Sequence, residues 1–127
     1  MSELKPEGSW IVFDGKKREL LFTLSAVEQL QEETNLPLDA LMQQFLQEDT
    51  EHLLLVILRI LLNDEADRRK YFENQELPKY EEKEMGWLVT MSDFLGYVSA
   101  VLDAYGISMP KAEEDAAPNR KSGNTKK

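Results

Sequence analysis

The sequence predicts a mainly α-helical domain that carries a small β-hairpin at its N-terminal end, an α+β arrangement. Two apolar runs near the start are separated by Asp14-Gly15, which is typical of a hairpin. Beyond them, apolar residues recur at helical spacing, and capping residues precede several of these segments. At 127 residues, with 42% hydrophobic and 31% charged residues, the chain has the size and composition of one globular domain.

The hairpin prediction rests on residues 10–13, which are strongly β-prone. Gly15 tolerates positive φ, and Asp14 can hydrogen-bond its own backbone, so the pair suits a tight turn. We expect the return strand over residues 20–24. An isolated hairpin is marginal in water, so it must pack on helices, on a further strand or on another chain.

The first helix is predicted to begin at Ser25. Glu28 follows three residues later, and together they form the pattern of a capping box. Val27 and Leu30 then face inward, and Asn35 followed by Pro37 stops the helix. A second helix is expected from residue 38 or 39 to residue 47.

A third helix is predicted from residue 51 to about residue 64, capped by Asp49 or Thr50. It is apolar on nearly all sides and must therefore be buried on nearly all sides. One interpretation is a central helix enclosed by the others. The other is that Leu55, Leu58 and Leu62 form a contact surface for a partner or a second copy, with Arg59 at its rim.

The last helix is expected to start between residues 80 and 86, after a break at Leu77-Pro78, and to end near Tyr105. Gly106 would be its C-cap. Its broad apolar side runs from Trp87 to Tyr105 and should pack onto the third helix. Met85 and Tyr97 lie off this side and are expected to be exposed, where methionine and aromatic side chains suit a binding surface.

These patterns give one set of predicted protein-contact residues: Leu55, Leu58, Leu62, Met85 and Tyr97. The domain is predicted over residues 10–107, between a flexible lead at residues 1–9 and a disordered tail at residues 108–127. We expect no signal peptide, and the apolar stretch at residues 53–62 is too short to span a membrane. The net charge of −9 disfavours nucleic-acid binding.

The sequence offers little for chemistry, so we expect no enzyme, no cofactor and no metal site. His52 is the one histidine and there is no cysteine, which leaves no metal-binding cluster. Residues 63–67 lack the ligand spacing and glycine of a calcium loop. The pairs at residues 32–33 and 81–82 would act as acid and base only in a closed cleft. Residues 68–72 form one short basic-aromatic cluster embedded among acids.

The segment from Asp14 to Thr34 carries a resemblance to a known family. A short strand, a D-G-K turn and the run E-L-x-F-T-L-x-A-V-E-x-L-x-E-E-T look like the N-terminal half of tail assembly chaperones of long-tailed bacteriophages and prophages. In layout the resemblance covers roughly residues 11–105. It implies a chaperone in the host bacterial cytoplasm that binds the tape measure protein and helps recruit tail tube subunits. It also implies a longer product made by a translational frameshift near the end of the short form.

Three other functions fit parts of the sequence. A self-associating structural or accessory component of a phage particle would use the same apolar surface as a homo-oligomer interface. An acidic mimic of nucleic acid would need carboxylates at regular surface spacing. An enzyme fits least well, because no catalytic signature is present.

Overall fold

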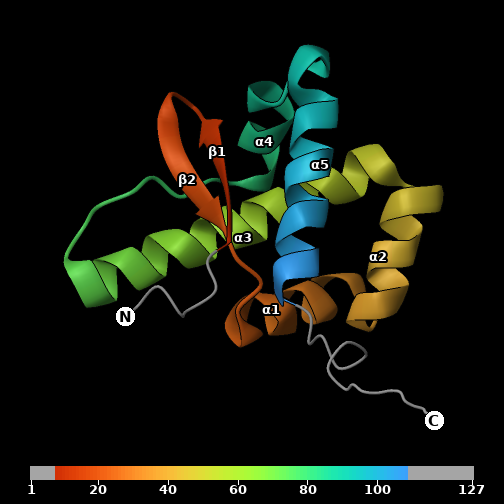
Figure 1. The fold of residues 1–127 in the computed structure, drawn as a ribbon, viewed down its shortest axis with the longest axis horizontal. Helices are drawn as coiled ribbons and strands as arrows, with labels where there is room; N and C mark the ends of the chain where they lie inside the picture. Colours follow the sequence, from red (N-terminus) through yellow and green to blue (C-terminus); the bar gives the residue numbers. More distant parts are fainter. Residues whose placement is uncertain (1–7, 109–127) are drawn as a thin grey trace, which may run out of the picture.

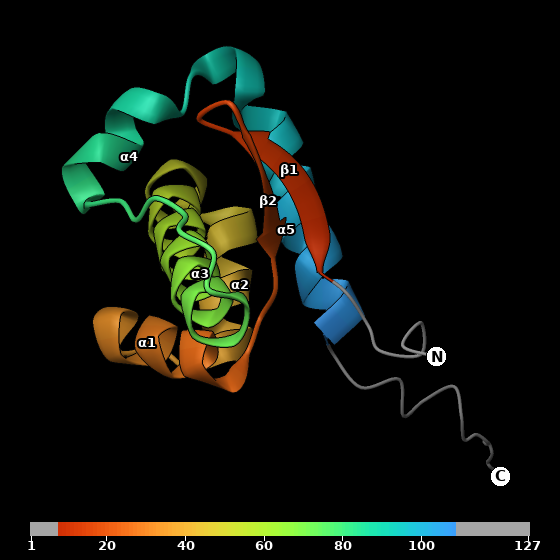
Figure 2. The same ribbon diagram turned by 90° about the vertical axis from the view of Figure 1, so that its left-hand side faces the viewer.

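The computed structural model describes residues 8–108, and the fold is mainly helical with an N-terminal hairpin, as predicted (Figure 1). The elements are β1 (Ser9–Phe13), β2 (Lys16–Leu20), α1 (Leu24–Thr34), α2 (Leu38–Gln47), α3 (Thr50–Glu73), α4 (Glu82–Leu88) and α5 (Met91–Ser108). The long helix α3 is central, and the hairpin and the other helices pack around it (Figure 2). Ser9 and Ser108 thus belong to β1 and α5, and Gly8 is buried, with its amide donating to the Glu19 carboxylate at 2.7 Å, so these three residues are not part of a flexible lead or tail. The rest of the predicted lead and tail, residues 1–7 and 109–127, lies outside the described residues.

The hairpin closes through a two-residue turn. Asp14 and Gly15 both have positive φ, 55° and 77°, as a type I′ turn requires. Pairing therefore resumes at once, with Phe13 opposite Lys16 and Ser9 opposite Leu20. The expected return strand over residues 20–24 is wrong, because this tight turn fixes the register four residues earlier than the apolar pattern indicated.

Helices of its own chain support the hairpin. β2 packs against α3, and β1 packs mainly against α5, so the sheet stands between these two helices (Figure 2). Phe13 and Leu20 are fully buried in the core. The ring of Phe13 also meets the rings of Tyr80 and Tyr97, with centroids 5.3 and 5.7 Å away. Packing on helices is thus the one of the three predicted possibilities that this structure realises.

Helix α1 is capped by Thr23, and the predicted capping box of Ser25 and Glu28 is wrong. The Thr23 hydroxyl accepts a hydrogen bond from the Ala26 amide at 3.0 Å and donates one to a carboxylate oxygen of Asp64 at 2.8 Å. Thr23 is a stronger cap than Ser25 because its hydroxyl bonds both the first turn of α1 and a carboxylate of α3. The helix ends as expected, with Asn35 at φ 59°.

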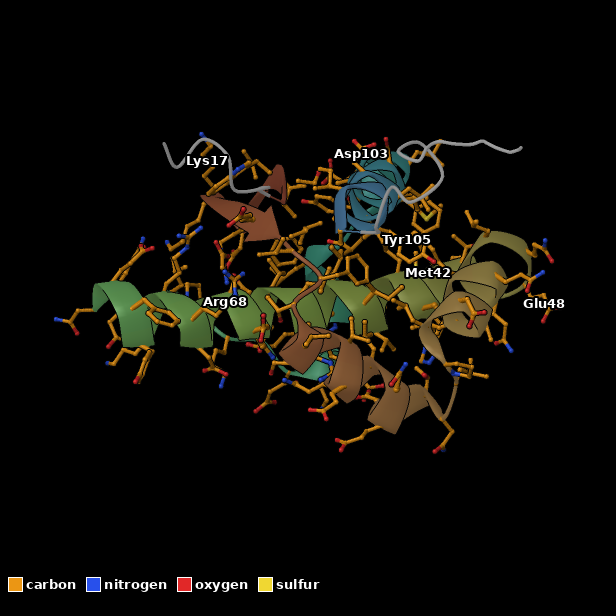
Figure 3. All side chains as sticks on the ribbon, turned by 60° about the horizontal axis from the view of Figure 1, so that its bottom comes forward. Lys17, Met42, Glu48, Arg68, Asp103 and Tyr105 are labelled. Carbon is orange, nitrogen blue, oxygen red and sulfur yellow. The ribbon has the colours of Figure 1, made fainter. Side chains whose placement is uncertain are left out.

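Helix α3 is the enclosed central helix that one of the two interpretations predicted. Its side chains are buried almost without interruption from Leu53 to Ala66. It continues to Glu73 instead of ending near Asp64, and Asn74 at φ 53° terminates it. The last turns extend past the hairpin, where side chains stand on both sides of the helix (Figure 3).

The predicted last helix is two helices, because the chain bends between Leu88 and Met91. The axes of α4 and α5 differ by 116°. Val89 and Thr90 interrupt the helical pattern, since β-branched residues are weak helix formers and threonine suits a helix start. The Thr90 hydroxyl donates to a carboxylate oxygen of Asp93 at 3.2 Å. Helix α5 then continues through the expected C-cap glycine to Ser108.

Candidate protein-binding site

Three of the five predicted contact residues are not on the surface. Leu58, Leu62 and Met85 are fully buried, so the contact surface expected from them does not form. The hairpin packs on the Leu62 side of α3, where the Arg18 guanidinium donates to the Leu62 carbonyl at 2.8 Å. Met85 is enclosed because α4 packs against α3. The sequence analysis expected this side of α3 to face a partner, with Arg59 at its rim, but Arg18 of β2 in the same chain packs against it.

The other two predicted residues are half-buried. Leu55 faces a surface depression beside the start of α4. Tyr97 packs on the hairpin, and its hydroxyl donates to the Val12 carbonyl at 3.0 Å. Burial, and to a lesser degree the nearby Asp93 carboxylate, raise the pKa of Tyr97, which keeps this donor protonated. Tyr97 therefore positions β1 on α5, and Leu55 is the predicted contact residue that still faces a surface feature.

Three large apolar side chains close to the bend between α4 and α5 are exposed: Trp87, Met91 and Leu95, which we call the α4–α5 corner. Their side chains are 73%, 78% and 75% exposed. Met91 and Leu95 are four residues apart on α5 and so share one face, and Trp87 lies just before the bend. Exposed tryptophan and methionine are unusual on a monomer and common at binding surfaces.

The bend explains why sequence reasoning missed this corner. On one continuous helix these residues would join the apolar side that packs on α3. Because α4 turns away by 116°, they stay outside, and α5 buries Ala100, Val101 and Ala104 instead. The local signal was present in the β-branched pair at residues 89–90, which disfavours a continuous helix.

Acidic side chains lie on both helices that form the α4–α5 corner. Glu81, Glu82 and Glu84 lie at the start of α4, and Asp93 lies in the first turn of α5. Within residues 8–108, Lys83 is the one basic residue in the first turns of α4 and α5. Apolar side chains with acidic residues on the same helices favour an apolar partner surface that also carries basic residues.

A buried polar network fixes the hairpin on α3. The Arg18 side chain is fully buried, and its Nε donates to Oε1 of Glu65 at 2.6 Å. The second oxygen of Glu65 accepts from the Glu19 amide at 3.1 Å and from Arg69 at 3.2 Å. Arg69 also binds the Glu19 carboxylate at 2.8 Å. Burial disfavours the charge of Arg69, but the hydrogen bonds that it donates to the Glu73 and Glu65 carboxylates, with the attraction of their charges, outweigh burial and raise its pKa. The network is satisfied internally and has a structural role.

Tyr80 anchors the segment between α3 and α4. Its backbone exchanges two hydrogen bonds with the Asn63 side chain, at 2.8 and 2.9 Å. Its hydroxyl donates to a carboxylate oxygen of Asp14 at 3.1 Å. Burial, together with the neighbouring Asp14 carboxylate, raises the pKa of Tyr80 to about 12. The hairpin turn is thereby tied to the chain that enters α4.

The remaining candidates from the sequence are His52 and the basic-aromatic cluster at residues 68–72. His52 is exposed, and no group of three metal-ligating side chains occurs within residues 8–108. In the predicted basic-aromatic cluster, Arg68 pairs with Asp64, and Lys70 pairs with Glu76, so the cluster is largely neutralised. Tyr71 and Phe72 stack edge to face on the protruding end of α3, 82% and 77% exposed.

Within the described residues, no single helix has the length and hydropathy to cross a membrane, and only α4 and α5 together, across their bend, meet that criterion. No family model matches this chain, and comparisons with curated proteins and with solved structures give no match either.

Proposed function

We propose that this chain is a non-enzymatic binding protein of the tail assembly chaperone type. In this proposal it acts in the host bacterial cytoplasm, binds the tape measure protein of a long-tailed phage through the α4–α5 corner, and helps recruit tail tube subunits. The observation that carries the proposal is the exposure of Trp87, Met91 and Leu95 on an otherwise well-packed acidic domain. The resemblance of the segment from Asp14 to Thr34 supplies the biological setting.

The physical logic is that of a soluble cover for an apolar helix. Burying a large apolar side chain contributes roughly 1.5–3 kcal/mol, so three such residues supply several kcal/mol of gross binding energy. An amphipathic helix of the partner can place its apolar face against them. The net charge of −9 keeps the complex in solution while the partner's apolar face is covered.

The test is co-expression with the large helical protein that this proposal expects to be encoded just downstream of this gene, and the absence of such a gene would contradict the proposal. We expect the partner to be insoluble alone, and to become soluble and co-purify with this chain. A Trp87→Ser, Leu95→Ser double variant should lose most of this effect. The matched control is Tyr71→Ser, Phe72→Ser, because these aromatic residues are equally exposed but lie at the far end of α3.

Two further results would contradict the proposal. If the wild-type chain and the downstream protein do not associate, the tail-assembly role is wrong. If they associate and both double variants behave alike, the corner is not the binding surface. Circular dichroism of each variant shows whether its fold is intact, which we expect because all four side chains are largely solvent-exposed.

The second candidate is a self-associating structural or accessory component of a phage particle, with the α4–α5 corner as a homo-oligomer interface. The same exposed residues favour it, but two copies that each carry −9 repel one another. Sedimentation velocity on the purified chain distinguishes the two functions. A stable oligomer that the Trp87→Ser, Leu95→Ser variant dissociates, together with detection of the chain in purified particles by mass spectrometry, would favour this alternative.

A further inference from the structure

Helices α1 and α4 both pack against α3 and lie apart from one another along it (Figure 2). Two depressions of about 310 and 650 Å³ border α3. Val56 of α3 lies at the first and Leu55 at the second, and Glu82 of α4 borders both. We call the two depressions together the α3 groove. Residues of α1, α2 and α3 line the first, and α4 with Leu55 of α3 lines the second.

The α3 groove is acidic. Four carboxylates line it, Glu33, Asp49, Glu81 and Glu82, against two basic side chains, Lys83 and His52. Glu33 forms an ion pair with Arg59 of α3 and is neutralised. Among residues 8–108, no ion pair engages the other three carboxylates. The groove therefore retains a negative charge.

We propose that the α3 groove binds a lysine- or arginine-bearing amphipathic helix of the partner. The apolar face of that helix would lie on the half-buried Leu55, and its cations would meet Asp49, Glu81 and Glu82. This inference rests on the proposed function for the identity of the partner, and it adds the partner's chemistry. A second copy of this chain suits the groove poorly, because each copy carries −9.

The groove adjoins the α4–α5 corner along α4. Gly86 lines the groove, and Trp87 is the next residue, about 100° further around the helix. A partner helix that lies in the groove can therefore continue over the corner. The groove then selects a partner helix with positive charge and sets the direction in which that helix lies, while the corner contributes apolar contact area.

The first measurement uses the full chain and a labelled synthetic helix of about 18 residues, roughly five turns, with leucine on one face and lysine on the other. Fluorescence anisotropy gives its dissociation constant. The comparison peptide has every lysine replaced by glutamine and keeps the same leucine face. We expect the glutamine peptide to bind about tenfold or more weakly, because several charge-assisted contacts are lost.

Two pairs of variants locate the binding. Glu82→Lys reverses a charge that both depressions share, and Glu28→Lys makes the same change on an exposed α1 position outside the groove. Gly86→Gln fills the groove, and Gly96→Gln is its control on α5. At both glycines an added Cβ meets no atom within 4 Å, and glutamine is the better helix former, so both variants should fold.

The proposal is supported if Glu82→Lys and Gly86→Gln each weaken lysine-peptide binding about fivefold or more while both controls stay within about twofold. It is overturned if the peptide does not bind, if both glutamate variants weaken binding equally, or if Gly96→Gln has the larger effect, which would place the peptide at the corner.

Co-expression separates the groove from the proposed function. If the downstream protein co-purifies equally with wild type, Glu82→Lys and Gly86→Gln, the function stands and the groove assignment is wrong. If the lysine peptide binds the groove but the downstream protein is never captured, the groove stands and the tail-assembly role is wrong.

Discussion

Arg18 is the residue on which the position of the hairpin most depends. Its guanidinium is fully buried, and it joins β2 to Glu65 and to the Leu62 carbonyl of α3. Burying two charges costs free energy that only close geometry and complete hydrogen bonding can offset. The pair therefore specifies which side of α3 the hairpin covers, more than it adds to net stability.

We expect Arg18→Met to lower the free energy of unfolding by about 3–5 kcal/mol, because Glu65 is left buried without its closest cation. Urea unfolding followed by circular dichroism measures the change. Lys16→Met, an exposed substitution on the same strand, should change it by less than about 0.5 kcal/mol. An equal effect of the two variants would show that the buried ion pair has no special role.

Because the pKa of Tyr80 is raised, we expect the folded chain to lose stability in alkaline solution. This pKa is raised from 10.0 to about 12 in the folded chain, so the folded state holds its proton more tightly than the unfolded state does. This contribution is fully present below pH 10 and is lost as pH rises toward 12. Urea unfolding across that range should show a weaker pH dependence for Tyr80→Phe than for wild type. Tyr71→Phe, at an exposed tyrosine, should retain the wild-type dependence.

At the scale of elements, the start of α1 shows how a contact with a distant helix selects one of two candidate caps. We expect Thr23→Ala to destabilise the chain by about 1–2 kcal/mol, since it removes the cap and the hydrogen bond to Asp64. Ser25→Ala should cost a few tenths of a kcal/mol at most. Thermal unfolding of the two variants compares them directly, and a larger loss for Ser25→Ala would contradict this assignment.

Local chemistry made most of the elements predictable. The Asp14-Gly15 turn, the stop at Asn35 and the bounds of α2 all depend on residues within one or two turns. The strand register and the bend before Met91 were missed for a common reason. In both places the prediction followed a pattern of apolar residues, which placed the return strand four residues too late and joined α4 to α5, whereas a short-range turn or cap preference set the element.

The binding surface was less predictable, because exposure depends on tertiary packing. An all-round apolar helix such as α3 gives no sign of which side its neighbours cover. Leu58 and Leu62 were assigned to the surface, yet the hairpin and its arginine cover that side. Conversely, Trp87 and Leu95 have the spacing of core residues and are exposed only because α4 and α5 diverge.

Considered as a whole molecule, the chain combines a strong negative charge with two surfaces suited to a basic amphipathic partner. The charge of −9 acts over about 10 Å at an ionic strength of about 0.1 M, and over only about 3 Å at about 1 M. Apolar contact at the α4–α5 corner acts only at short range. Added salt should therefore slow the association of the partner more than it speeds the dissociation of the complex.

We expect raising the ionic strength from about 0.1 M to about 1 M to lower the association rate of the lysine peptide about tenfold or more, with a smaller change in its dissociation rate. Stopped-flow fluorescence of Trp87, in a Trp10→Phe background that leaves it as the single tryptophan, measures both rates. The glutamine peptide should associate slowly and independently of salt. If salt instead acts mainly on dissociation, the charges contribute at close contact in the α3 groove and long-range attraction has no part in recognition.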